Sequence, residues 1–97
     1  GTSAGNTLTT GSNNTIIGND ADVDNNARTG CIVLGASASS LAAIAGSHLS
    51  IGSVGVPIAT SLTIGAAGAA AALPAAPQTY LHLAVNGVEY KMPLYLP

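Results

Sequence analysis

The sequence is poor in charge and in cysteine. Only 6% of its 97 residues are charged, and two Lys or Arg residues against four Asp or Glu residues give a net charge of −2. A nucleic-acid-binding surface needs several basic groups on one face, so the composition argues against nucleic acid as a partner. The single cysteine, Cys31, excludes both an intrachain disulfide and a metal knuckle built from paired cysteines.

Large aromatic residues and long apolar runs are also lacking. Phe and Trp are absent and Tyr occurs three times, although 47% of the residues are hydrophobic. No apolar run of about 18 residues exists, so the sequence predicts no membrane-spanning segment. A thin aliphatic core beneath a charge-poor surface predicts an oligomer, in which partner chains bury part of the apolar surface.

Four segments of the chain, at positions 14–18, 31–35, 48–52 and 61–65, end in the same way, with an aliphatic residue followed by glycine. The glycines are Gly18, Gly35, Gly52 and Gly65; the first three are evenly spaced, and the fourth follows after a shorter interval. The preceding residues are Ile17, Leu34, Ile51 and Ile64, and the residues two positions earlier are Thr15, Ile32, Leu49 and Leu62. Such periodicity is typical of a repeat architecture.

Each segment predicts a strand of about four residues that ends at a glycine, where a positive φ lets the backbone turn. Stacking successive strands about 4.8 Å apart places Ile17, Leu34, Ile51 and Ile64 in one ladder, which we expect to point inward. The residues between, Ile16, Val33, Ser50 and Thr63, fit a strand face that lies against something else. The sequence therefore predicts a parallel β-solenoid, in which Ile51→Asp would destroy folding.

Other parts of the repeat region are less regular. A small residue stands three positions after each glycine, and alternation at Val54, Val56 and Ile58 predicts a further strand with Pro57 at an edge or corner. Helix is the competing structure for residues 40–45 and 69–73, because both runs have high helix propensity.

The repeats resemble those in the head domains of trimeric autotransporter adhesins. The most similar stretches are residues 31–38 (CIVLGASA) and 48–55 (HLSIGSVG), and the resemblance covers roughly residues 5–68. It implies a left-handed parallel β-roll, three copies of which pack about a threefold axis.

The C-terminal part carries the clearest local signal. After an Ala/Pro-rich bridge at residues 66–77, two alternating runs, 80–85 and 88–92, flank Asn86 and Gly87, which predicts a type I′ hairpin. A two-residue turn pairs Val85 with Val88, Leu83 with Tyr90 and Leu81 with Met92 on one face, and His82 with Lys91 and Ala84 with Glu89 on the other. The apolar face needs a cover, for which the open end of the solenoid and two neighbouring chains are candidates. The hairpin is thus expected to act as a trimerising cap.

Residues 80–95 are also similar to the C-terminal ends of surface and fibre proteins of large algal DNA viruses and of some phages. This resemblance implies a virion-exposed, trimeric fibre or attachment segment. Its location would be the virion surface or the extracellular space, and its partner a glycan of the host cell wall.

Three carboxylates, Asp20, Asp22 and Asp24, follow the opening spacing of a calcium loop. The loop fails as an EF-hand because Asn25 occupies the sixth position and Cys31 the twelfth. We expect a solvated, turn-forming insertion, in which Asp22→Ala would be nearly silent. Whether the three carboxylates hold a cation stays open at this point.

Cys31 and His48 occupy the same repeat column, so stacking would bring them close, as a nucleophile and its base would be. Asn14 and Ser61 share that column, and no oxyanion-binding motif accompanies it, which favours a tolerant polar column over a small hydrolase or autoproteolytic tail. His82 beside Lys91 predicts a surface pair, three copies of which near an axis could bind an anion.

The sequence as a whole predicts an all-β, homotrimeric β-roll over residues 1–65, a bridge over 66–77 and a hairpin cap over 78–97. We expect a non-enzymatic fibre segment that attaches to host glycan, without cofactor, metal or catalytic residues. The alternative is a pure trimerisation module. The residues expected to carry the structure are Gly18, Gly35, Gly52, Gly65, Ile17, Leu34, Ile51, Ile64, Asn86 and Gly87.

Overall fold

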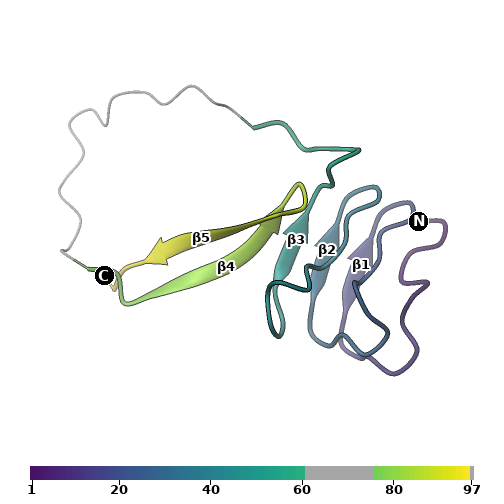
Figure 1. The fold of residues 1–97 in the computed structure, drawn as a ribbon, viewed down its shortest axis with the longest axis horizontal. Helices are drawn as coiled ribbons and strands as arrows, with labels where there is room; N and C mark the ends of the chain where they lie inside the picture. Colours follow the sequence, from purple (N-terminus) through teal and green to yellow (C-terminus); the bar gives the residue numbers. More distant parts are fainter. Residues whose placement is uncertain (61–75, 97) are drawn as a thin grey trace.

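A computed structural model describes residues 1–60 and 76–96 of the chain. These residues form one five-stranded sheet whose strands follow in chain order (Figure 1). The strands are β1 (Thr15–Ile17), β2 (Ile32–Leu34), β3 (Leu49–Ile51), β4 (Thr79–Val85) and β5 (Val88–Leu94). No helix occurs among the described residues, so the all-β prediction is confirmed there. The repeat at 61–65 and the helix candidate at 69–73 lie outside them.

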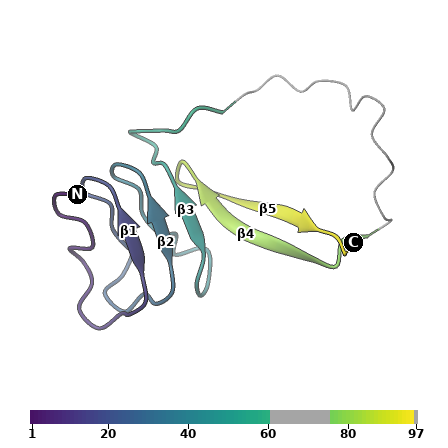
Figure 2. The same ribbon diagram turned by 180° about the vertical axis from the view of Figure 1, so that it is seen from behind.

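The N-terminal half winds into stacked coils of constant length. Strands β1, β2 and β3 pair in parallel, and each residue lies beside the residue 17 positions further along the chain. The same offset holds away from these strands, where Asp22 and Ser39 form a parallel bridge. Hydrogen bonds between coils continue there, from the Asp20 N–H to the Thr2 carbonyl (2.8 Å) and from the Ser37 N–H to the Asn19 carbonyl (2.9 Å). Figures 1 and 2 show the coils side by side from opposite directions. The predicted stacking is thus confirmed for the first three segments.

Each of these strands is followed by a glycine for two reasons, the backbone conformation at that position and the lack of room for a side chain. Gly18 and Gly35 have φ of +141° and +118°, which side chains disfavour. A Cβ on Gly18 would also clash with the Gly35 carbonyl group in the next coil, and one on Gly35 would lie 3.2 Å from the Gly52 nitrogen. The glycine column therefore lets successive coils approach each other.

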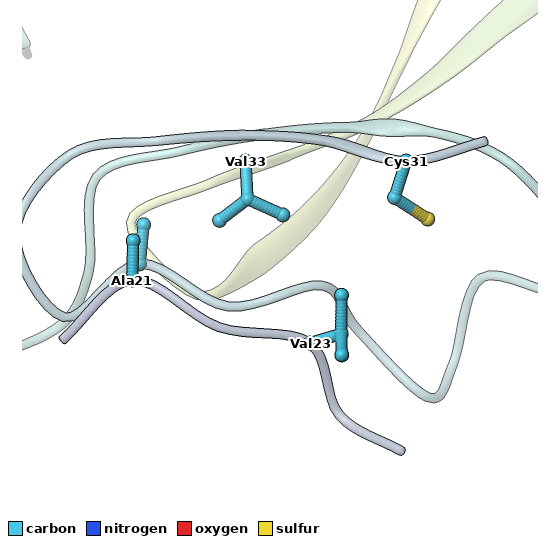
Figure 3. Close-up of a cluster of buried hydrophobic side chains, with 5 residues drawn as sticks. Ala21, Val23, Cys31 and Val33 are labelled. Carbon is cyan, nitrogen blue, oxygen red and sulfur yellow. The ribbon is translucent and has the colours of Figure 1, made fainter. Parts of the chain in front are cut away.

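The side of the strands that lines the interior of the coils is the opposite of the side expected from the sequence. Val33 and Cys31 are fully buried and point across the coil towards Ala21 and Val23 (Figure 3). Ile17, by contrast, is 59% exposed. The prediction that Ile17, Leu34 and Ile51 point inward is wrong for the single chain.

The width of the coil explains this reversal. The wall facing the strands presents Ala21 and Ala38, which are fully buried, so the two walls lie close together. The inward column consists of small or β-branched side chains, Ile16, Val33 and Ser50, which fill this narrow space without overpacking. The column of Ile17, Leu34 and Ile51 takes the outer side. Asp in place of Ile51 would therefore not enter the interior, which removes the reason for expecting that substitution to abolish folding.

Neither the competing helix at residues 40–45 nor the strand predicted around Val54, Val56 and Ile58 is formed. Residues 40–45 contain a turn closed by the Ile44 N–H on the Leu41 carbonyl (3.1 Å) instead of a helix. Residues 53–58 form no strand, because the Ser53 hydroxyl accepts the Val56 N–H (2.9 Å) and the Ser53 N–H donates to the Val56 carbonyl (3.2 Å). These local bonds replace those of a strand, and Val54 is 81% exposed.

The hairpin forms with the predicted register. Asn86 and Gly87 have φ of +52° and +78°, as a type I′ turn requires. The predicted opposite pairs are all present: Val85 and Val88, Ala84 and Glu89, Leu83 and Tyr90, His82 and Lys91, and Leu81 and Met92. Both strands are longer than predicted and bring Pro93 opposite Tyr80, which an edge strand tolerates.

The hairpin extends the sheet, since β4 pairs in parallel with β3 and aligns Leu83 with Leu49 and Val85 with Ile51. The open end of the coil stack therefore does not cover the apolar residues of the hairpin. Of the two covers expected from the sequence, the open end of the solenoid is thus excluded for the single chain. The Asn86 side chain fastens this junction by accepting the Ile58 N–H (2.9 Å) and donating to the Ile58 carbonyl (3.2 Å).

Candidate functional site

One apolar face runs across all five strands, on the side of the sheet away from the coil interior. The strand alternation that buries Val33 turns its neighbours Ile32 and Leu34 outward, and the register carries this side into the hairpin. We call this surface the apolar face: Ile17, Ile32, Leu34, Leu49, Ile51, Leu81, Leu83, Val85, Val88, Tyr90 and Met92.

Much of the apolar face lies open in the single chain. Ile17 is 59% exposed, Tyr90 52%, Val88 51% and Ile32 45%. The residues at its centre, such as Leu83 at 8%, are covered by their neighbours in the sheet. Contiguous apolar surface of this kind is uncommon on soluble monomers and marks an interaction site.

The apolar face carries no charge, although six charged residues occur in the chain. Four of them, Asp20, Asp22, Asp24 and Arg28, lie between β1 and β2 on the return side of the coil. Glu89 and Lys91 pair with Ala84 and His82, on the opposite side of the hairpin. A partner of this face therefore has to be apolar, and two copies of the face do not repel each other.

The carboxylate of Asp22 joins two coils. Its oxygens accept the Thr7 hydroxyl (2.6 Å), the Thr7 N–H (3.0 Å) and the Val23 N–H (2.8 Å). Desolvation by burial raises the pKa of Asp22, but these hydrogen bonds outweigh it and the pKa is lowered overall. The expectation of a solvated insertion is wrong at Asp22. Asp22→Ala would lose bonds between coils, which removes the reason for expecting that variant to be silent.

Asp24 and Arg28 form a second connection between coils. The guanidinium Nε lies 2.5 Å from Asp24 Oδ1, and its Nη2 and Nη1 donate to the carbonyls of Leu41 (2.6 Å) and Gly46 (3.1 Å) in the next coil. Desolvation raises the pKa of Asp24, but hydrogen bonds from Arg28, Ser40 and Asn25 lower it to about 2. The hydrogen bond to Asp24 in turn raises the pKa of Arg28.

The three carboxylates thus bind separate partners, because Asp20, unlike Asp22 and Asp24, accepts a hydrogen bond from the Asn19 amide (2.8 Å). Across residues 1–60 and 76–96, no three His, Cys, Asp or Glu side chains gather as metal ligands would. The carboxylates Asp22 and Asp24 instead connect coils, a role that the sequence pattern did not reveal.

Cys31 and His48 do lie together, as the shared column predicted, with Sγ 3.9 Å from Nδ1. Both are buried, Cys31 fully and His48 to 7% exposure. His48 Nε2 accepts the Leu41 N–H (3.0 Å) and Nδ1 lies 3.1 Å from the Gly46 carbonyl. Because a carbonyl only accepts, Nδ1 carries the proton and the ring is neutral. Both nitrogens therefore bind the backbone, which supports a structural role for His48.

The predicted surface pair of His82 and Lys91 is opposite in register, yet His82 makes its close polar contact with its diagonal neighbour Glu89. His82 Nδ1 lies 3.5 Å from Glu89 Oε2. Diagonal neighbours lie within reach across an antiparallel pair, so the pairing pattern could have revealed this contact.

Comparison with protein-family models, with curated proteins and with solved structures finds no match. Within the part of the chain that the structure describes, no helix has the length and apolar character needed to cross a membrane.

Proposed function

We propose that the chain is a non-enzymatic, homotrimeric fibre segment in which three left-handed β-rolls bury their apolar faces against one another around a threefold axis. The observation that carries the proposal is the apolar face itself, which spans five strands without a charge. Burial of this surface supplies the stabilisation that a thin aliphatic core lacks.

Two features favour copies of the same chain as the cover. A neutral face offers no charge pattern by which a different protein would be selected, but it is compatible with its own copies. The ladder also repeats with the same period in every coil, so parallel chains around one axis bring equivalent coils to the same height. Each rung of one ladder then meets the matching rungs of the others.

The wider role in this proposal is host attachment through a cell-surface glycan, at a virion surface or elsewhere outside the cell. The two sequence resemblances support this role. The alternative is a pure trimerisation or assembly module, which the apolar face supports equally well because it needs no ligand.

Sedimentation of the purified chain at micromolar concentration tests the assembly. We expect a species of three times the 9.4 kDa chain mass. Ile17→Asp should dissociate it, because it places a carboxylate in the apolar face, whereas Thr2→Asp adds the same charge on an exposed turn and should not. Circular dichroism verifies that both variants are folded. A folded wild-type monomer would refute the assembly, and a dimer would refute the threefold arrangement.

A glycan array or a cell-wall pull-down separates the two roles. Retention of the wild-type trimer supports attachment, and its absence in an intact trimer leaves assembly alone.

A further inference from the structure

A cleft lies between the hairpin and the last coil. Its volume is about 580 Å³, and its lining comes from the loop after residue 42 in the last coil (Ala43, Ile44, Ala45, Ser47 and His48) and from the hairpin (Leu81, His82, Glu89 and Lys91). We call it the hairpin cleft. Cavities of several hundred cubic ångströms are typical of small-molecule sites.

The hairpin gathers its two charged side chains and His82 on the side that faces this cleft. His82, Glu89 and Lys91 point to one side of β4 and β5 because they occupy alternate positions of paired strands. Glu89 is within 3.5 Å of His82, while Lys91 forms no ion pair with any described residue. The ammonium group of Lys91 is thus the charge available to a ligand.

The remaining wall of the cleft is of a different character. Ala43, Ile44 and Ala45 present an aliphatic surface, and Ser47 offers a hydroxyl group. The floor at His48 is fixed, because both ring nitrogens already bind the backbone of the same coil. A ligand therefore meets one cation that no described residue pairs, one carboxylate, a hydroxyl and an aliphatic wall.

We propose that the hairpin cleft binds a sugar that carries one carboxylate, of the uronic acid type. The carboxylate pairs with the Lys91 ammonium group in a charge-assisted hydrogen bond. Ring hydroxyls donate to Glu89, and the C–H face of the ring packs against Ile44 and Ala45. Glu89 disfavours a dianion such as phosphate by like-charge repulsion.

The cleft and the apolar face meet at Leu81, which belongs to both. The pairs His82 with Lys91 and Ala84 with Glu89 alternate with the apolar pairs along the hairpin, so the polar side chains of the cleft lie on the side of the hairpin opposite the apolar face. Three chains that meet through their apolar faces would carry three open clefts at the periphery. The three Lys91 groups would then lie away from the axis, unlike the axial anion site considered from the sequence. The inference rests on the attachment role proposed above and gives it a location.

Titration of the ¹⁵N-labelled full chain with glucuronic acid tests the site, with glucose and sodium acetate as comparison ligands. We expect saturable shift changes in the hairpin and in residues 43–48 with glucuronic acid. Lys91→Gln should weaken binding about tenfold or more, because a charge-assisted bond is lost. Glu89→Gln should strengthen it about threefold, because a nearby negative charge is removed.

Asp20→Asn is the matched control for Glu89→Gln, since it removes one negative charge outside the cleft and should leave affinity unchanged. Several results would overturn the proposal: no saturable binding, unchanged affinity in Lys91→Gln, or equal affinity for glucose. Equal affinity for acetate would overturn its sugar component. Sedimentation of the same samples keeps the tests distinct, because a trimer without binding refutes the cleft, and a binding monomer refutes the assembly.

Discussion

The two sides of the strands make different contributions to stability, which a pair of alanine substitutions can measure. Val33 is fully buried inside the coil and Ile17 is 59% exposed on the apolar face. Val33→Ala removes two carbon atoms, about 1.6 kcal/mol of transfer free energy. The cavity left in the narrow interior raises the expected cost to about 2–3 kcal/mol.

The second substitution, Ile17→Ala, removes three carbon atoms, about 2.4 kcal/mol if the side chain were fully buried. With 59% of Ile17 exposed in the single chain, only about 1 kcal/mol of this is lost from the folding of one chain. The remaining loss of about 1.4 kcal/mol per chain falls on assembly. For three chains it amounts to about 4 kcal/mol, or roughly a thousandfold in the association constant.

Urea unfolding below the dissociation concentration and sedimentation equilibrium above it report the two quantities separately. We expect Val33→Ala to lower the unfolding free energy and to leave the association of folded chains nearly unchanged. We expect Ile17→Ala to do the reverse. Two results would refute this division: an equal loss of unfolding free energy in the single chain for Ile17→Ala and Val33→Ala, or a wild-type association constant for Ile17→Ala.

Three further substitutions address the contacts within and between coils. Because hydrogen bonds lower the pKa of Asp24 to about 2 from 3.8, the stabilisation they give is present above about pH 4 and is lost as the pH falls towards 2. Asp24→Asn should lower the free energy of unfolding by about 1 kcal/mol at pH 7 and should weaken the fall of the urea midpoint between pH 4 and pH 2. An unchanged fall would contradict the role of Asp24 in connecting the coils. His48→Gln, whose side-chain oxygen still accepts the Leu41 N–H, should be about 1–2 kcal/mol more stable in urea than His48→Leu, which leaves that N–H unpaired; equal stability would mean that the bond contributes nothing. Gly35→Ala should lower the melting temperature more than Gly46→Ala, because both glycines have positive φ but only the Gly35 position is crowded by the next coil; the opposite order would rule out crowding as the cause.

The hairpin and the stacking could be predicted from the sequence because local chemistry determines both. Asn86 and Gly87 accept the positive φ that a two-residue turn requires, and that turn length fixes every opposite pair from Val85 and Val88 outward. The stacking register follows from the spacing of the glycines, since Gly18 and Gly35 turn the chain at the same point of each coil.

The side of the strands that points inward could not be predicted from the strands alone. Each repeat strand is short, and in β2 all three residues are aliphatic, so alternation gives no direction. The facing wall decides the direction, because Ala21 and Ala38 leave a narrow space that the small or β-branched column of Ile16, Val33 and Ser50 fills. The small residue three positions after each glycine is the signal in the sequence that indicates this narrow width.

The polar contacts between coils escaped prediction for a similar reason. Asp22 and Asp24 resemble a solvated loop because their partners, Thr7 and Ser40, lie in other coils. Once the period of the coils is accepted, Ser40 falls one period after Val23, next to Asp24. The period therefore locates such partners to within a residue or two.

The constant length of the coils has a consequence for how a protein of this kind changes size. Duplication of residues 18–34 would insert one complete turn that keeps the strands in register, since each strand residue pairs with its counterpart 17 positions away. Such an event would lengthen the rod by about 4.8 Å, but one copy each of Asp22 and Asp24 would stack on the duplicated coil instead of on Thr7 and Ser40, so these contacts between coils would need compensating substitutions. Insertion of any other number of residues would shift all later rungs out of alignment, so gene slippage would be tolerated only in whole turns.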